Sequence, residues 1–230
     1  MMEEKHKKIL KKKKLTQKSN SVLNNSTNTE TTLHEKVYLM NDEDKIEKIK
    51  QHFFQIMKIL GLDMNDDSLC MTPQRVAQMF VKEIFSGLNP KNMPHLSIFE
   101  NKYKYRQMLI EKNITVYSTC EHHFLPIVGK AHVGYISNGK VVGLSKINRI
   151  VNFYAKRPQV QERLTIQIVQ YLKKMLGTQD VACVIEAKHL CVNSRGIRDI
   201  DSRTVTTELT GSFKENSEIR KEFLHHIGIS

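Results

Sequence analysis

The chain has 230 residues, a formal net charge of +12 at pH 7, 40% hydrophobic residues and no tryptophan. No apolar run approaches the roughly 20 residues of a membrane-spanning helix, and the first twenty residues lack the apolar segment of a secretory signal peptide. We therefore expect a cytoplasmic protein without a membrane partner, in which the four cysteines (Cys70, Cys120, Cys183 and Cys191) are thiols or metal ligands rather than disulfides.

Residues 1–40 are predicted to form a disordered, Lys-rich tail and linker. Half of the net charge lies in residues 1–20, which contain eight Lys and two Glu, and residues 19–32 are rich in Asn, Ser and Thr. A Lys-rich run without aromatic side chains attracts nucleic acid only through salt-sensitive, sequence-blind contacts. A nucleic-acid partner is therefore the less favoured interpretation, and the basic body suits an anionic small substrate.

A pair of helices is predicted to follow the tail. Apolar residues recur at helical spacing after Asn41 or Asp42, either of which can cap the first helix, and Gly61 fits the position just past its end. The second helix is predicted to begin at Thr72-Pro73, with Thr72 as the N-cap, and to stop at Gly87.

The rest of the chain mixes strand and helix signals. Ser145 is predicted to cap a helix, Pro158 to start the next one, and Gly177 to end it. The predicted strands cover residues 114–118, 127–136, 141–144, 181–187 and 203–209, and the predicted helices cover residues 145–154, 158–176 and about 215–227. This order predicts an α+β fold with a mainly antiparallel sheet and helices on one face.

A metal site is predicted from two cysteines and a histidine. Cys120 and His123 are three residues apart, so one short turn can present both to the same ion. Cys191, in a predicted strand end before a polar loop, is the best third ligand. Three protein ligands leave one position of tetrahedral zinc open for water, which is typical of a catalytic site. The alternative is that both cysteines are small buried residues, because Cys-x-x-His alone is a weak pattern.

Two further histidines, His122 and His189, are candidates for acid–base chemistry because a free imidazole exchanges its proton near neutral pH. The alternative for each is a structural histidine that is hydrogen-bonded to the backbone. Gln161 and Glu162 lie near the start of a predicted helix. A carboxylate there can accept two N–H bonds from the guanine edge, or it can simply face water.

Basic residues near these positions are candidates for binding an anion. Ser145 and Lys146 at a helix start combine free N–H groups, a hydroxyl and an ammonium, and arginine offers a bidentate fork to phosphate oxygens. The alternative is that these charges are simply solvated. The basic residues concerned are Lys146, Arg149, Arg195 and Arg198.

Five motifs occur together in this chain. They are residues 118–124 (STCEHHF), 143–149 (GLSKINR), 157–164 (RPQVQERL), 189–192 (HLCV) and 195–199 (RGIRD). In these motifs and their order the chain resembles the GTP cyclohydrolase I family, over about residues 42–227.

The resemblance implies an activity and a set of roles. It implies hydrolysis and rearrangement of GTP to 7,8-dihydroneopterin triphosphate and formate, the first step of tetrahydrofolate or pterin synthesis. Zn²⁺ is the implied cofactor, and a zinc-bound water is implied to attack C8 of GTP. The implied metal ligands are Cys120, His123 and Cys191. The implied proton carriers are His122 and His189, and the implied substrate contacts are Gln161 and Glu162 for guanine and Ser145, Lys146, Arg149, Arg195 and Arg75 for the ribose triphosphate.

The resemblance also implies a tunnelling fold (T-fold) over residues 105–230, preceded by a helical pair over residues 41–90, with residues 41–230 as one catalytic domain. It implies a homo-oligomer, a decamer whose active sites lie between subunits, with Arg75 supplied by a neighbour. Gln78 departs from the family, which often has Lys there, and this puts the outer-phosphate contacts of that helix in question.

Two other functions compete with this one. A related tunnelling-fold enzyme for another purine or pterin, such as a deazaguanine reductase, is expected to use a nucleophilic cysteine without the zinc trio. A non-catalytic basic binding module is not expected to retain a complete site. The presence of Cys120, His123 and Cys191 together argues against both.

Overall fold

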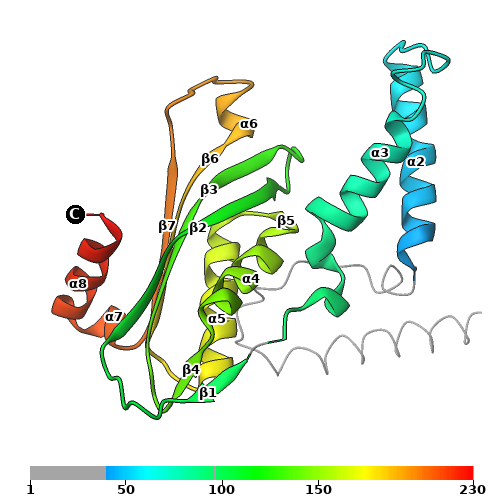
Figure 1. Ribbon diagram of the computed structural model, residues 1–230. Helices are drawn as coiled ribbons and strands as arrows, with labels where there is room; N and C mark the ends of the chain where they lie inside the picture. The colour runs from blue at the N-terminus through cyan, green and yellow to red at the C-terminus, as the bar shows by residue number, and fades with distance from the viewer. Residues whose placement is uncertain (1–39, 96, 230) are drawn as a thin grey trace, which may run out of the picture.

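The computed structural model describes residues 40–95 and 97–229 (Figure 1). The tail predicted over residues 1–40 therefore lies almost entirely outside the described residues. Within the described ranges, no helix has both the length and the apolar character needed to cross a bilayer.

The first helix of the predicted pair is confirmed as α2 (Asp42–Ile59). The Asn41 side chain accepts a hydrogen bond from the Asp44 backbone N–H, so Asn41 is the N-cap. Acidic residues fill the first turn and Lys58 lies in the last, which complements the helix dipole at both ends. Gly61 follows with a φ of 82°, a backbone conformation that glycine adopts without strain.

The second helix differs from its prediction in two ways. It begins as α3 (Thr72–Gln78), but Met71 holds the cap position and no side chain caps the helix, so the prediction of Thr72 as N-cap is wrong. It then widens into a π-helix, η2 (Met79–Ile84), before two short 3-10 turns, η3 (Ser86–Leu88) and η4 (Pro90–Asn92). Such π-helical turns are often found near functional sites.

A five-stranded sheet forms the body, in the order β5-β2-β3-β6-β7. Only the short β2–β5 pair is parallel, and the other neighbours are antiparallel. The strands are β2 (Met108–Cys120), β3 (Pro126–Ile136), β5 (Pro158–Gln159), β6 (Val181–His189) and β7 (Thr204–Leu209). β1 (Ile98–Glu100) and β4 (Lys140–Val142) form a separate two-stranded sheet, so the two strands that flank the turn at residues 137–139 do not pair with each other.

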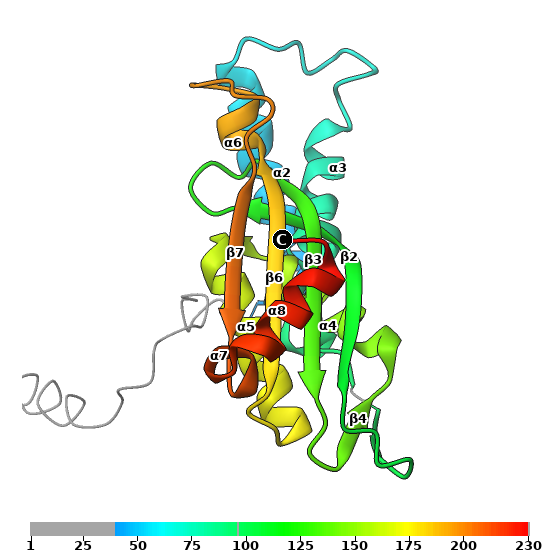
Figure 2. The same cartoon turned by 90° about the vertical axis from the view of Figure 1, so that its left-hand side faces the viewer.

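Helices cover both faces of the large sheet (Figure 2). α4 (Leu144–Ala155) and α5 (Gln161–Leu176) bury the main hydrophobic core against one face. α7 (Ser212–Glu215) and α8 (Ser217–Ile227) pack on the opposite face, where Phe213 and Phe223 are fully buried in a second cluster with Ala182 and Val184. The α+β class is confirmed, and the prediction of helices on one face holds only for α4 and α5.

Both predicted starts of the central helices need correction. Gly143 holds the cap position of α4, and Ser145 lies inside the first turn without capping it. Pro158 belongs to β5, because its segment pairs with the end of β2, and α5 begins only at Gln161. The end of α5 is as predicted, with Gly177 in the left-handed conformation at a φ of 65°.

Candidate active site

The turn between β2 and β3 brings Cys120 and His123 together. The Cys120 N–H donates to Leu125 O at 2.8 Å, and the Phe124 N–H donates to Cys120 O at 2.9 Å. These two bonds close a compact turn, in which Cys120 Sγ lies 4.0 Å from His123 Nδ1. We call residues 120–125 the metal turn. Its geometry agrees with the prediction that one short turn brings the Cys120 and His123 side chains together.

Phe124 holds this turn in an unusual conformation. Its φ of 54° lies in the left-handed region, which costs a non-glycine residue about 1–3 kcal/mol unless the surroundings enforce it. The Phe124 ring packs against Phe85 and Phe80, with centroids 5.3 Å and 6.4 Å away. Both partners come from the end of the second N-terminal helix, so the helical pair packs against the metal turn and supports its conformation.

The third predicted ligand arrives from the neighbouring strand. Register pairs Ile127 of β3 with His189 of β6, so the end of β6 lies beside the metal turn. Cys191 follows in α6 (Leu190–Asn193), a short helix rather than the strand end that we predicted.

The three predicted ligands converge. The ligand atoms of Cys120, His123 and Cys191 all lie within 4.8 Å of one another. Ligand atoms on one tetrahedral zinc ion are about 3.4–3.8 Å apart, given Zn–S and Zn–N bonds of about 2.3 Å and 2.1 Å. Small side-chain movements therefore suffice to fit an ion. Burial, and then the adjacent Cys120 thiol, raise the pKa of the Cys191 thiol, and the Arg195 charge opposes this shift.

The two adjacent histidines, His122 and His123, differ in whether their ring nitrogens lie close to Cys191. His122 Nδ1 lies 3.9 Å from Cys120 Sγ, as close as His123 Nδ1, so Cys120 alone does not distinguish them. Only His123 joins the three-residue group that includes Cys191. The His122 side chain is 65% exposed, which leaves it accessible to a bound substrate.

The His189 ring forms a hydrogen bond with a buried side-chain amide. Its Nε2 lies 2.7 Å from Gln161 Oε1. The Gln161 Nε2 donates to Ile185 O, Thr204 O and Thr206 Oγ1 at 2.9–3.1 Å, and the residue is only 1% exposed. Burial lowers the pKa of His189, although the nearby Glu162 carboxylate opposes this shift. The Gln161 side chain, for which the resemblance implied a guanine contact, is buried here and orients His189. The sequence alone did not reveal this second role.

Glu162 and Arg195 lie at this same end of the sheet. Glu162 is exposed in the first turn of α5, close enough to His189 for its charge to be felt there. Arg195 follows α6, and its positive charge acts on Cys191. We use the name metal end of the sheet for the metal turn together with His189, Cys191, Glu162 and Arg195.

Three other predicted substrate contacts lie in the first turns of α4, at the opposite end of the sheet. They are Ser145, Lys146 and Arg149. Asn148 of α4 donates to Glu111 Oε1 at 3.1 Å, and Ser118 of β2 donates to Ala155 O at 2.7 Å. α4 therefore runs alongside β2 in the same direction (Figure 1), and its first turns lie beside the start of β2. Nine residues of extended chain, about 25–30 Å, separate Glu111 from Cys120.

We call this region the basic end. Ser145 and Arg149 are exposed there and Lys146 is half-buried. In residues 40–95 and 97–229, neither cation forms an ion pair. One chain thus does not bring these three residues to the metal turn.

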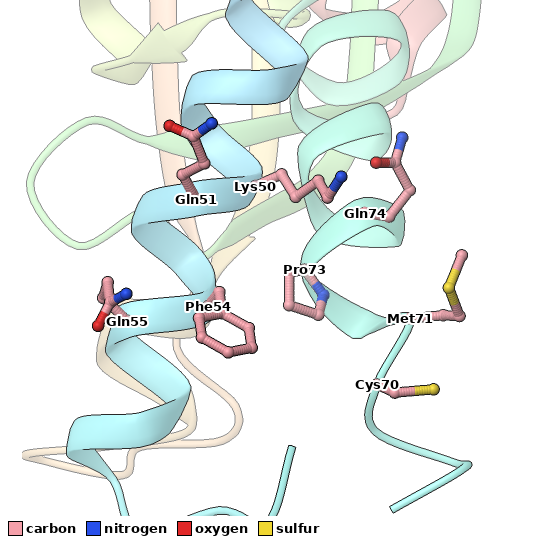
Figure 3. A pocket seen from close by; sticks show the side chains of 8 residues that line it. All are labelled: Lys50, Gln51, Phe54, Gln55, Cys70, Met71, Pro73 and Gln74. Carbon is pink, nitrogen blue, oxygen red and sulfur yellow. The ribbon is translucent and has the colours of Figure 1, made fainter. Parts of the chain in front are cut away.

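Arg75 lies in a third place, on α3. Its Nη2 donates to Ser68 O at 2.9 Å and to Thr72 Oγ1 at 3.1 Å. A cavity of about 360 Å³ opens nearby between α2 and α3, where Phe54 faces Pro73 (Figure 3). None of the predicted site residues lines it. Its lining residues are Lys50, Gln51, Phe54, Gln55, Cys70, Met71, Pro73 and Gln74.

Two residues at the metal end were quoted above only as parts of motifs. Arg163 of α5 forms an ion pair with Glu121 of the metal turn. Opposite charges 42 positions apart in the sequence give no signal of pairing until the fold brings them together.

Comparisons with known proteins agree with these features. The family model described as GTP cyclohydrolase I matches residues 49–228. A protein named GTP cyclohydrolase 1 from Flavobacterium johnsoniae is 64% identical over 202 residues, which cover 88% of this chain and 90% of the relative. Relatives with the same name from Aeromonas salmonicida and Vibrio cholerae are 55% and 54% identical, over 80% and 81% of this chain and 85% and 86% of their own lengths.

Matches of this extent cover both the helical pair and the sheet with its metal turn. The α+β architecture agrees with the tunnelling fold that the sequence motifs implied. The chain belongs to the GTP cyclohydrolase I family.

Proposed function

We infer that this protein converts GTP to 7,8-dihydroneopterin triphosphate and formate, as the entry step of tetrahydrofolate or pterin synthesis. The observation that carries the inference is the convergence of Cys120, His123 and Cys191 in a chain of this family. The catalytic unit that we propose spans residues 41–230, and we assign the reaction to the cytoplasm because its ligands are thiols that must stay reduced.

We propose Zn²⁺ as the ion held by these three residues. Two thiolates and an imidazole are a ligand set that zinc accepts readily, and three protein ligands leave a position open. A zinc ion held there would supply an activated water for hydrolysis at neutral pH.

The remaining residues of the metal end suit proton transfer and base recognition. His122, accessible within the metal turn, is suited to give and take protons at the imidazole ring of GTP. His189, whose pKa is lowered by burial and whose ring is oriented by Gln161, suits a second acid–base role. The exposed Glu162 carboxylate can accept two N–H bonds from guanine, and adenine lacks that pair of donors.

The triphosphate requires the basic residues, and these lie too far from the metal turn within one chain. We therefore propose that Ser145, Lys146 and Arg149 reach the metal end of a neighbouring subunit, beside its Arg195, and that Arg75 comes from a further neighbour. This supports a homo-oligomer with shared sites, for which we propose a homodecamer. Neither a reductase of the same fold nor a basic binding module requires such an arrangement around three metal ligands.

The direct test is to incubate the purified protein with GTP and to measure pterin fluorescence and formate. We expect both products to form. Their formation should stop when the protein is treated with a zinc chelator and should resume when zinc is added. ATP is the matched control and should give neither product. Failure to form a pterin from GTP with zinc present would refute the proposed activity, and equal turnover of ATP would refute the role of Glu162.

A further inference from the structure

The Glu121–Arg163 ion pair joins the metal turn to the start of α5. Glu121 lies between the ligand Cys120 and the proposed proton carrier His122, and its Oε2 accepts a hydrogen bond from Arg163 Nη2. The two side chains are 31% and 19% exposed, so the pair is largely shielded from water. A charge-assisted hydrogen bond in such surroundings is stronger and more directional than an ordinary surface contact.

Arg163 itself is fixed by a buried frame. Its Nε donates to Gln159 Oε1 at 2.9 Å, and its Nη2 also donates to Pro158 O at 3.1 Å. Gln159 is fully buried and its Nε2 donates to Tyr154 O and to Gln167 Oε1. The guanidinium is therefore a rigid fork that projects from the core, and it is not a mobile surface cation.

The backbone follows the same connection. The Glu121 N–H donates to Gln159 O at 3.0 Å, beside the parallel pairing of Cys120 with Gln159. Both the main chain and the side chain of Glu121 are thus tied to the segment that leads into α5. That helix carries Glu162, and its first residue orients His189.

We propose that Arg163 and Glu121 are positioning residues for the metal site. Arg163 holds the Glu121 carboxylate, and this contact fixes the turn that presents Cys120 and His123 at the distance from Cys191 and Glu162 that the reaction requires. Neither residue of the pair needs to touch GTP or the ion. The inference rests on the proposed zinc site. It explains why Glu121, which is not a ligand, lies in the metal turn.

The test uses the variants Glu121→Gln, Arg163→Met and the double variant of the whole oligomer. Zinc affinity is measured by competition with a chromogenic chelator, and ligand geometry by the visible spectrum of the cobalt(II)-loaded protein. Removal of a group that orients metal ligands typically weakens metal binding by about 10–100-fold, and we expect each single variant to fall in this range. Because the two residues act as one unit, the double variant should lose no more than either single variant.

Arg203→Met is the matched control, since Arg203 pairs with Glu186 at 2.8 Å on the same sheet without a contact to the metal turn. It should keep wild-type zinc affinity and cobalt spectrum. Arg163→Lys, which retains charge but not the fork, should give an intermediate loss. Wild-type affinity and spectrum in Glu121→Gln, whose near-identical shape preserves packing, would overturn the proposal. A wild-type protein that binds no zinc would refute the metal assignment instead.

Discussion

The metal end and the basic end of the sheet are built in opposite ways. At the metal end, side chains are tied to one another: Gln161 to His189, Arg163 to Glu121, and Phe124 to the aromatic rings of the helical pair. At the basic end, Ser145 and Arg149 are exposed on the first turns of α4.

This difference has a physical reason. A site that performs bond-breaking chemistry needs its groups held in place before the substrate arrives, because every group ordered during the reaction adds to the barrier. Phosphate contacts are less demanding in geometry, since long cationic side chains adjust to oxygens that carry several lone pairs. The metal end is therefore preorganised within one chain, and the basic end remains available to a second chain.

The largest expected effect comes from removal of a metal ligand. We expect Cys191→Ser to lose stoichiometric zinc and to produce no detectable formate from GTP, because two protein ligands hold zinc far less well than three. Metal content by atomic spectroscopy and formate release are the measurements. Cys70→Ser, at an exposed cysteine outside the site, should behave as the wild type. Stoichiometric zinc with full turnover in Cys191→Ser would contradict the ligand assignment.

A smaller loss is expected from His122→Ala. His122 lies outside the three-residue group, so the variant should retain zinc. Loss of a general acid–base group should lower kcat by about 10²–10⁴-fold. Single-turnover measurement of ring opening and of pterin fluorescence would show which step has slowed. His225→Ala, at an exposed position of α8, is the control; normal product formation by His122→Ala would remove His122 from the mechanism.

The separation of the two ends can be tested by mixing subunits. His123→Ala damages the metal end and Arg149→Ala the basic end, so each variant alone should be nearly inactive. If every site takes its two ends from different chains, equal random mixing should restore roughly a quarter of wild-type activity, because one combination in four is intact. The measurement is GTP turnover after co-expression of the two variants.

A matched mixture separates this result from trivial stabilisation. His123→Ala mixed with Cys191→Ser combines two defects of the same end, and it should stay inactive in every arrangement. An inactive mixture of His123→Ala with Arg149→Ala would place a complete site within one chain, which would contradict the proposed sharing.

The metal end was the more predictable of the two from sequence. Cys120 and His123 are three residues apart, and this spacing on one turn restricts where their side chains can point. Cys191 was predicted from its place at a strand end before a polar loop, and the structure puts it in α6, directly after β6. The helical pair was predictable for a similar reason, since its apolar periodicity and the Asn41 cap are local signals.

Features that depend on distant contacts could not be predicted in this way. The Gln161 amide is buried by β6 and β7, so its role under His189 exists only in the fold. Ser145 looked like a helix cap by residue type, but Gly143 occupies that position because β4 ends one residue before it. The C-terminal helix carries the same apolar stripe whichever face it covers, and only packing against Ala182 and Val184 places it opposite α4 and α5.

The smallest expected effect concerns the sheet that separates the two ends. His132 lies in the middle of β3 and is only 6% exposed. Burial lowers its pKa below the ordinary 6.5; Glu186 opposes the shift and Lys112 reinforces it. As the pH falls below about 6.5 the unfolded chain binds a proton that the folded protein resists, so the free energy of unfolding should decrease until the folded-state pKa is reached.

Urea unfolding at a series of pH values measures this decrease. His132→Asn removes the titrating group but keeps an acceptor near the Asn113 N–H, which lies 3.5 Å from His132 Nδ1, so its stability should depend less on pH in this window. His225→Asn, at an exposed site, should retain the wild-type slope. If His132→Asn also retains that slope, other groups cause the acid sensitivity. If it flattens the slope, the sheet that holds the two ends apart is stabilised by a histidine that must stay neutral.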